Sequence, residues 1–407
     1  MLHQKSDVIK LRECVACGSE NLKLTLDLGD QPLANSYKLN RDDWQPSYPL
    51  AINRCTDCYH VQLTHSVNPK LMFEDYLYVS GTSRTMHEHM EQFAKFSDQF
   101  VKTNKTVLDI GCNDGTQLDY YKKMGYTTIG VDPAKNLYEK TSKRHEIYCD
   151  YFENSFISAL AEAELGLIVA QNVFAHGPDP LHFLQMAKAI MNDDTTLIIQ
   201  TSQANMILNN EFDTIYHEHI SFFNIQSMDT LCKRAGLHLV SVEHMPIHGT
   251  SFVFVIRKKD DGRNVDLLID EERSKGLYLE ETYETYAKTA RDIAEKLVHE
   301  CDFVRQSMIG WNVVGYGAAA KGMTLLNFAK LNLDFIVDDS PLKQGRFTPG
   351  MSIPIVSADS LDSLKDTTLF VPLAWNFFDE IRTKIKQRHP NQYDKFITYF
   401  PKVELRS

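Results

Sequence analysis

The chain has 407 residues, of which 43% are hydrophobic and 24% charged, the balance of a globular protein long enough for two or three domains. It has no apolar run of the roughly 18–20 residues that span a bilayer, and the N-terminal MLHQKSDVIKLREC has no secretory apolar segment, so we expect a cytoplasmic protein without a membrane partner. The net charge of −11 argues against a nucleic-acid partner, although a few local donors could hold an anionic small molecule.

Two CxxC pairs near the N-terminus account for four of the eight cysteines: Cys14 with Cys17, and Cys55 with Cys58. A CxxC turn presents two thiolates along one edge of a tetrahedron, so the two pairs predict one zinc ion per chain. All four positions are then filled by the protein, which predicts a structural ion in a module over residues 1–80. The alternative is four unpaired buried cysteines.

Short apolar strands alternate with helical patterns between residues 81 and 264, which predicts a parallel-sheet α/β domain. The expected strands are 106–111, 127–132, 165–172, 195–200 and 251–256. A polar linker at 257–264 and long helical patterns over 265–308 follow. A second α/β region over 265–407 then has expected strands at 311–317, 335–339, 367–372 and 397–400. The predicted architecture is two Rossmann-like units in series behind a metal module.

The turn LDIGCNDG follows the first strand of the central domain and predicts a methyl-donor site. Its glycines allow a ligand close to the backbone, and Asp132, at the end of the next strand, suits the two hydroxyls of a ribose. Acids in the turn would repel a pyrophosphate, whereas they favour the sulfonium of S-adenosylmethionine. The predicted donor-binding residues are Asp109, Gly111, Asn113, Asp114, Gly115, Asp132, Asp150 and Asn172. The alternative is a flavodoxin-like or reductase domain with coincidental glycines.

Several histidines allow more than one interpretation. His217 and His219 could be metal ligands if they lie in a strand, because residues i and i+2 share a face. A second His-Glu-His, at 87–89, is expected to be a solvated helix face without a role. His176 follows an expected strand at the ligand-binding edge of the sheet, and is either a structural histidine or a site residue.

Eight motifs in order through the chain carry a resemblance to a known family. Besides the four cysteines they are EDYLYVSGTS (74–83), LDIGCNDG (108–115), QNVFAHGPD (171–179), DTIYHEHISFF (213–223), GYGAAAKGMTLLN (315–327), DDSPLKQGRFTPG (338–350) and WNFFDEI (375–381). The chain resembles the zinc-containing, three-domain, S-adenosylmethionine-dependent sugar C-methyltransferases, which act at C3 of 4-keto-6-deoxy nucleotide sugars.

The resemblance implies three domains, with a nucleotide-diphosphate keto-deoxysugar as the substrate. It implies that His219 is the base, supported by Tyr216, Glu218, His176 and a tyrosine of EDYLYVS, for which we prefer Tyr78 to Tyr76. The chemistry agrees with these residue types. A carbon next to a ketone becomes nucleophilic when its proton is removed, which calls for a base near neutral pKa and donors to the developing oxyanion.

The segment VVGYGAAA (313–320) fits GxGxxA, and its residues Gly315, Tyr316 and Gly317, together with Lys321, are predicted to bind the diphosphate of the sugar nucleotide. Two other interpretations stay open. The motif could bind a dinucleotide, with Asp338 after the next strand, in an NAD-dependent sugar-nucleotide oxidoreductase. Its glycines could also serve packing alone. Further alternatives are methylation of an O or N acceptor, and a scaffold whose zinc module recruits a protein.

Overall fold

The computed structural model describes residues 7–73, 79–82, 84–102, 104–153, 156–157, 160, 163–202, 205–247 and 249–406. Tyr76 and Tyr78 lie outside these residues. The chain forms two compact units, which we call unit 1 and unit 2. Unit 1 comprises Met1–Lys23, Asn53–Ala204 and Glu218–Tyr278, and unit 2 comprises Leu24–Ile52, Asn205–His217 and Leu279–Ser407. The chain therefore passes between the units several times.

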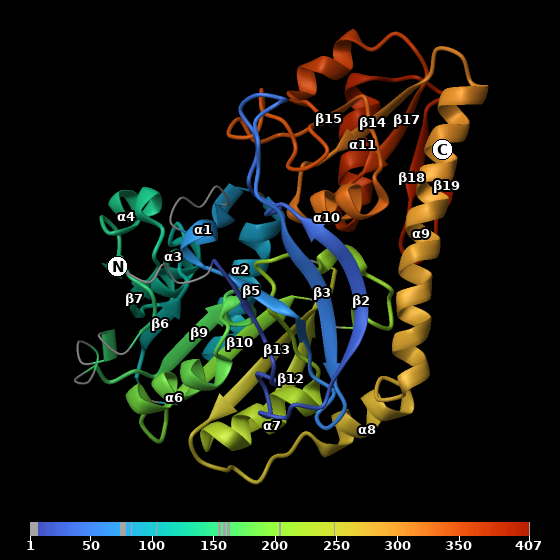
Figure 1. The fold of residues 1–407 in the computed structure, drawn as a ribbon. Helices are drawn as coiled ribbons and strands as arrows, with labels where there is room; N and C mark the ends of the chain where they lie inside the picture. Colours follow the sequence, from blue (N-terminus) through green and yellow to red (C-terminus); the bar gives the residue numbers. More distant parts are fainter. Residues whose placement is uncertain are drawn as a thin grey trace, which may run out of the picture. The chain divides into compact units, whose positions relative to one another are not determined.

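Unit 1 is built on a sheet that has seven strands within the described residues, in the order β12-β13-β10-β9-β6-β7-β8 (Figure 1). The strands are β6 (Thr106–Ile110), β7 (Thr127–Val131), β8 (Glu146–Tyr148), β9 (Leu167–Gln171), β10 (Thr196–Ser202), β12 (His238–Met245) and β13 (Ser251–Arg257). Strands β6 to β10 pair in parallel, whereas β13 is antiparallel to both β10 and β12. The order reverses between β6 and β9, and ligands of such sheets bind at this point, beyond the carboxyl ends of the strands.

The predicted parallel sheet is confirmed for four of the five predicted strands, which are β6, β7, β9 and β10, whereas the fifth, β13, is antiparallel. The strands β8 and β12 were not predicted. The sequence of β12, HLVSVEHM, begins two residues after the helix α7 (Ile225–Ala235) ends at Gly236, whose φ is +66°. Glycine adopts this left-handed conformation without strain, so the chain can turn directly into a strand. The hairpin of β12 and β13 then pairs with β10 and makes the end of the sheet antiparallel.

One of the other helices of unit 1 begins at a side chain that caps it. Asp179 accepts a hydrogen bond from the backbone of His182 at the start of α6, with Pro180 in its first turn. The helices are α1 (Lys70–Phe73), α2 (Arg84–Asp98), α3 (Thr116–Lys123), α4 (Lys135–Thr141), α6 (Pro180–Ile190), α7 and α8 (Asp266–Ser274), with short 3₁₀ turns at Ser80–Thr82 and Phe174–His176.

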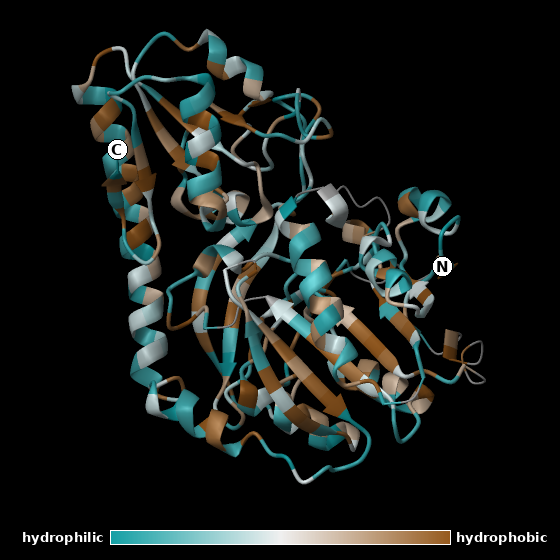
Figure 2. Cartoon of the chain, turned by 180° about the vertical axis from the view of Figure 1, so that it is seen from behind, coloured by the Kyte–Doolittle hydropathy of each residue, from teal (hydrophilic) through white to brown (hydrophobic). Residues whose placement is uncertain are grey.

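The core of unit 1 lies between the sheet and the helices α2 and α3. Val169, Ile198 and Val253 from three neighbouring strands are fully buried against Phe93 of α2 and Leu118 of α3. These strands are hydrophobic along most of their length, as Figure 2 shows. A sheet covered by helices excludes water from its strands, which accounts for continuous apolar runs in place of alternation.

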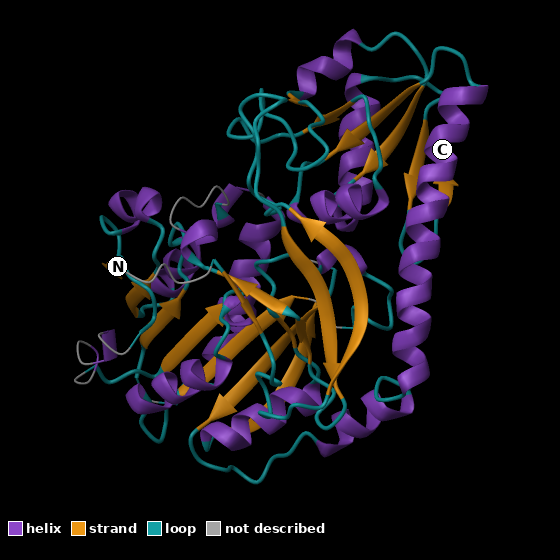
Figure 3. Ribbon diagram, in the orientation of Figure 1, coloured by secondary structure: helices purple, strands orange, loops and turns teal. Residues whose placement is uncertain are grey.

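The N-terminal region consists of short antiparallel strands, shown with the other strands in Figure 3. β1 (Val8–Lys10) pairs with β5 (His65–Val67), and a second sheet has the order β11-β4-β3-β2 in the described chain. Its strands are β2 (Leu22–Gln31), β3 (Tyr48–Cys55), β4 (Val61–Leu63) and β11 (Ser221–Phe222). The division between units 1 and 2 falls within β2 and β3.

Unit 2 contains a second mainly parallel sheet, in the order β16-β15-β14-β17-β18-β19 among the described residues, in which only β19 is antiparallel. The strands are β14 (Asn312–Tyr316), β15 (Phe335–Val337), β16 (Ile355–Val356), β17 (Thr368–Pro372), β18 (Lys395–Thr398) and β19 (Glu404–Arg406). The helices are α9 (Glu280–Ser307), α10 (Ala320–Ala329) and α11 (Phe378–Arg388), with 3₁₀ turns at Phe212–Thr214, Ala358–Ser363 and Trp375–Phe377.

The predicted fold class is confirmed: a cysteine cluster precedes a Rossmann-like sheet, and a second Rossmann-like sheet follows it. The division into domains at residues 80 and 264 stays a prediction. In the described part of the chain, no helix combines the length and apolar character needed to cross a membrane.

Candidate functional site

The four cysteines of the CxxC pairs come together in unit 1. Their sulfur atoms all lie within 4.8 Å of one another, with Cys14 Sγ 3.5 Å from Cys58 Sγ and Cys17 Sγ 3.6 Å from Cys55 Sγ. In a tetrahedral site with Zn–S bonds of about 2.3 Å, the sulfurs are about 3.8 Å apart. The cluster therefore fits one zinc ion.

The turns that present these cysteines are shaped by backbone hydrogen bonds. Gly18 N donates to Cys14 O (2.7 Å) and Tyr59 N donates to Cys55 O (3.1 Å). Both donors have positive φ, +81° for Gly18 and +61° for Tyr59. The two turns are thus alike, and each brings its second cysteine back toward the first.

The predicted methyl-donor turn connects β6 to α3. Gly111 and Gly115 both have φ of +75°, so each occupies a conformation that other residues adopt with strain. A Cβ atom on Gly115 would lie 2.6 Å from Thr141 Cγ2, which leaves no room for a side chain. These two positions therefore depend on glycine, as the sequence predicted.

Asp132 lies directly against this turn. One of its carboxylate oxygens accepts a hydrogen bond from Asn113 N (2.8 Å) and the other from Ala134 N (2.9 Å). Burial raises the pKa of Asp132 and, more strongly, that of the fully enclosed Asp109, whose pKa the charge of Asp132 raises further. Both shifts favour the neutral carboxyl, so the attraction of these acids for a sulfonium stays a prediction.

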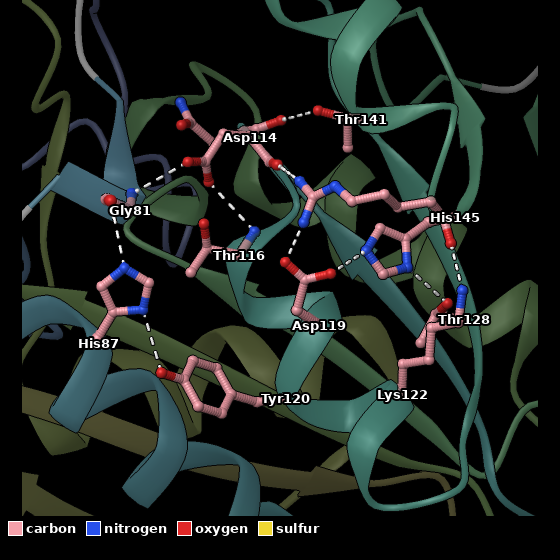
Figure 4. Close-up of polar contacts among 12 residues, drawn as sticks. Gly81, His87, Asp114, Thr116, Asp119, Tyr120, Lys122, Thr128, Thr141 and His145 are labelled. Atoms are coloured by element: carbon pink, nitrogen blue, oxygen red, sulfur yellow. Dashed lines mark hydrogen bonds and ion pairs between the residues drawn. The ribbon is translucent and has the colours of Figure 1, made fainter.

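Asn113 and Asp114, predicted to contact the donor, hold a neighbouring segment of unit 1 (Figure 4). Asn113 Oδ1 accepts from Ser80 N (3.0 Å), and Asp114 Oδ2 accepts from Gly81 N (3.2 Å). The other oxygen of Asp114 accepts from Thr116 N (3.1 Å) at the first turn of α3. The turn and residues 80–81 thus form one connected structure, which was not foreseen.

The remaining predicted donor residues follow the carboxyl ends of two other strands of this sheet, β8 and β9. Asp150 comes after β8, is exposed, and accepts a hydrogen bond from Tyr151 N. Asn172 comes directly after β9 with a φ of +54°, and its side-chain Oδ1 is buried without a partner among the described residues. A strained polar residue with an unsatisfied oxygen is typical of a ligand site.

His176 and His219 are neighbours in unit 1. Their ring centroids are 5.3 Å apart, and Phe73 stacks on His176 at 5.6 Å. The main chain fixes this pairing, because Ile220 N donates to Ala175 O (2.9 Å). Burial lowers the pKa of His176 to about 4, so its ring is neutral at neutral pH. His219 is 5% exposed.

The motif that precedes His219 is not a strand, which removes the geometric basis for a His217–His219 metal pair. Residues 217–218 form a turn, and His217 Nε2 donates to Tyr48 O (3.2 Å) within unit 2. Within the described residues, the four cysteines are the cluster with metal-ligand geometry. Tyr216 belongs to unit 2, whereas Glu218 and His219 belong to unit 1.

The His-Glu-His at 87–89 was expected to form a solvated helix face, but of its three residues only Glu88 is exposed. His89 is 8% exposed and lies in the core side of α2. His87 is half-buried, with its ring nitrogens 3.1 Å from Tyr120 Oη and 3.3 Å from Gly81 O. Residues two apart on a helix point in different directions, so the pattern by itself could not show that both histidines turn inward.

Side chains from elsewhere in unit 2 bind the backbone of its glycine turn. Asp338, which would hold a ribose in a dinucleotide site, accepts from Ala318 N (2.7 Å). Lys343 Nζ and Tyr37 Oη both donate to Ala318 O. A Cβ atom on Gly315 would lie 2.9 Å from side-chain atoms of Leu333 and Ile336 in the core. The contacts of Gly315 favour the packing interpretation for that residue. The dinucleotide interpretation at Asp338 stays open, because Asp132, the predicted ribose ligand of the donor site, binds backbone amides in the same way.

Three further residues in or next to this turn were predicted to bind substrate. Tyr316 Oη donates to Asp339 Oδ1 (2.9 Å), while Gly317 has φ of +87° and donates to Val337 O. Lys321 Nζ lies 5.3 Å from the ring centroid of Trp375. Their role in substrate binding stays a prediction.

Three families match the chain in succession. Residues 14–73 match a family described as "Putative zinc binding domain", residues 83–242 a "Methyltransferase domain" and residues 246–401 a "C-methyltransferase C-terminal domain". Together with the cysteine cluster and the donor turn, these matches define the chain as a zinc-containing, S-adenosylmethionine-dependent C-methyltransferase. The resemblance found in the sequence is thereby confirmed.

The chain is also similar to several individual proteins. The chain is 29% identical to the C-methyltransferase NovU of Streptomyces niveus, over 98% of both chains. It is 28% identical to a ubiquinone biosynthesis O-methyltransferase of Actinobacillus pleuropneumoniae over 24% of this chain and 45% of that relative. Among solved structures, a methyltransferase from Archaeoglobus fulgidus is 14% identical, with a TM-score of 0.37 over 42% of this chain and 94% of its own.

Proposed function

We propose that the chain methylates C3, the carbon next to the ketone, of a 4-keto-6-deoxy nucleotide-diphosphate sugar. The observation that carries this proposal is the buried pair of His219 and neutral His176 in the unit that contains the donor turn. The match with a C-methyltransferase over nearly the whole chain supports a carbon acceptor. We include a cytoplasmic location in this proposal.

The reaction needs a carbanion equivalent. In the proposed role, His219 removes the proton from C3, and the electrons of the C–H bond pass into an enolate with its charge on the ketone oxygen. His176 is neutral and can donate one ring N–H to that oxygen. The hydroxyl group of Tyr216 or Tyr78 can serve as the donor in the same way. Glu218 orients a neighbouring group. A neutral donor suits this task because it stabilises the developing charge without giving up its proton beforehand.

Bound S-adenosylmethionine supplies an electrophilic methyl group on a positively charged sulfur. In this proposal the chain itself holds the ribose hydroxyls at Asp132, and the carboxylate of Asp114 in the turn favours the cation. If the methyl arrives on the face opposite the departed proton, the configuration at C3 inverts. Lys321 and the turn Gly315–Gly317 hold the diphosphate in this proposal.

The direct test incubates the purified protein with S-adenosylmethionine and a panel of 4-keto-6-deoxy sugars linked to thymidine or guanosine diphosphate. We expect mass spectrometry to find one added methyl on at least one sugar, bonded to carbon by nuclear magnetic resonance. Transfer to an oxygen or nitrogen of the same sugar would support the alternative acceptors. Absence of transfer to every sugar, with an active donor site, would refute the proposed substrate class.

A further inference from the structure

His87 of the first His-Glu-His motif has a geometry that a merely solvated helix residue would not have. Its Nε2 faces the carbonyl oxygen of Gly81, which can only accept, so Nε2 carries the hydrogen. In the neutral ring Nδ1 is then an acceptor, and Tyr120 Oη donates to it at 3.1 Å. Tyr120, on α3, therefore fixes the tautomer of His87 that binds Gly81 (Figure 4).

Gly81 is held from both sides of its backbone. Its carbonyl accepts from His87, and its amide donates to Asp114 Oδ2 in the donor turn at 3.2 Å. A Cβ atom at this position would collide with the Thr116 hydroxyl and lie 2.7 Å from the Asp114 carboxylate. Glycine is therefore required here by the close approach of the backbone to the turn, although its φ is ordinary.

The neighbouring residue strengthens the same connection. Ser80 N donates to Asn113 Oδ1 at 3.0 Å, so two successive amides of residues 80–81 bind two successive side chains of the turn. Asn113 itself has a φ of +49° and donates its backbone N–H to Asp132. The chain of contacts thus runs from Tyr120 through His87, Gly81 and Asp114 to the turn whose backbone binds Asp132, the proposed ribose acid.

We infer that His87 and Tyr120 are positioning residues of the methyl-donor site, because they fix the Gly81 peptide that the side chains of Asn113 and Asp114 bind. The inference rests on the proposed location of the donor. A turn whose side chains are already ordered loses less entropy when a ligand binds, so releasing the Gly81 carbonyl weakens donor affinity. In this role His87 positions the donor turn without contacting the donor. The hydrogen bonds that define this role involve neither His176 nor His219, the histidines of the proposed acceptor site.

The test compares two variants of the full-length protein that differ in which ring nitrogen they imitate. His87→Gln places an amide N–H near the position of Nε2 and keeps the bond to Gly81 O. In His87→Asn the side-chain amide extends only as far as the position of Nδ1. This variant therefore keeps the hydrogen bond with Tyr120 and loses the hydrogen bond to Gly81 O. Titration calorimetry with S-adenosylmethionine and with S-adenosylhomocysteine measures the dissociation constants, and melting without ligand measures stability.

We expect His87→Asn to raise both dissociation constants roughly 2- to 10-fold, the effect of one neutral hydrogen bond, and His87→Gln to stay within about 2-fold of wild type. We expect Tyr120→Phe to give dissociation constants between those of the two His87 variants. Glu88→Gln, on the exposed face of the same helix, is the matched control and should bind as wild type does, since its surface pair with Arg84 contributes little. Equal affinities in the Asn and Gln variants would overturn the inference, whatever their melting temperatures.

Asp132→Ala separates this inference from the proposed site. Loss of hydrogen bonds to a charged acceptor should raise the donor dissociation constant roughly 10- to 150-fold. If Asp132→Ala weakens binding and His87→Asn does not, the donor site stands and the role of His87 is wrong. If Asp132→Ala has no effect while the two His87 variants still differ, His87 positions a donor whose ribose lies elsewhere.

Discussion

At the scale of the residue, the proposed chemistry depends on a histidine, His219. His219 is buried beside His176, whose ring is in turn covered by Phe73. An imidazole in an enclosed site accepts a proton from substrate without competition from bulk water. The neighbouring His217 has a different task, because it binds the backbone of Tyr48.

The His219→Asn variant tests the proposed base. Asparagine approximates the shape of imidazole but accepts no proton near neutral pH, so we expect methyl transfer to fall roughly 10²- to 10⁴-fold. Donor affinity should be unchanged. Solvent deuterium exchange at C3, followed with a donor analogue that cannot react, should occur in wild type and vanish in the variant. Exchange and methylation at wild-type rates would place the base elsewhere, with Glu218 and Tyr216 as the next candidates.

Two buried histidines predict a loss of stability in acid. Burial lowers the pKa of His176 and of His217 to about 4, below the value of about 6.5 in an unfolded chain. Between these values the unfolded chain binds more protons than the folded one. The stability that each histidine contributes is therefore complete above about pH 6.5 and is lost as pH falls toward 4, with roughly 2 kcal/mol lost by about pH 5.

The variant His217→Gln isolates one of these contributions. Glutamine can still donate to Tyr48 O but does not titrate. We expect a melting temperature close to wild type at about pH 8, and a smaller decrease than wild type on acidification to about pH 5. Calorimetry across this range measures the difference. The same pH dependence in both proteins would show that His217 is not the titrating group.

At the scale of the element, short turns position most of the site. The two CxxC turns carry the cysteines, and the turn between β6 and α3 carries the donor residues. The sequence predicted these turns because glycine spacing and paired cysteines are local signals. It did not predict the hydrogen bonds of Ser80 and Gly81 to the donor turn, since the partners are distant in sequence and meet only in the folded unit.

The cysteine turns should depend on the metal. Replacing Cys55 by Ser removes one of four thiolates, so we expect zinc content to fall well below one per chain, together with folding yield and melting temperature. Turnover per correctly folded molecule should change less, because a closed site supports structure alone. Cys149→Ser is the control, since Cys149 is exposed and outside the cluster. Full activity in a folded, metal-free sample would contradict a structural role.

At the scale of the whole molecule, the folding units do not coincide with continuous stretches of sequence. The C-terminal sheet of unit 2 packs with residues that occur much earlier in the chain. Phe212 contacts both Phe328 and Phe400, at ring distances of 5.5 Å, and Trp375 Nε1 donates to the fully buried Asp213 (2.8 Å). Thr324 Oγ1 also donates to Ile215 O. A segment from the middle of the chain is thus part of the core of unit 2.

This organisation predicts how a fragment behaves. Residues 279–407 expressed alone lack the segments 24–52 and 205–217, so the aromatic surface around Phe328 and Phe400 is left exposed. We expect this fragment to melt without a sharp transition and to be cut by protease much faster than the full chain. Circular dichroism and limited proteolysis measure both properties. A cooperative transition and protease resistance equal to those of the full chain would show that the earlier segments are dispensable.

The sequence by itself determined the zinc cluster, the two sheets and the position of the donor turn, because each depends on residues close together in the chain or on strand periodicity. Tertiary structure alone decided the rest. The antiparallel β12–β13 hairpin, the pairing of His219 with His176 and the inward direction of His87 depend on contacts between segments far apart in sequence. His217 gives the same lesson: its spacing from His219 would suit a metal pair in a strand, but residues 217–218 form a turn and His217 binds the backbone of Tyr48. Local patterns show which groups a segment offers, whereas the fold decides whether those groups face a ligand or one another.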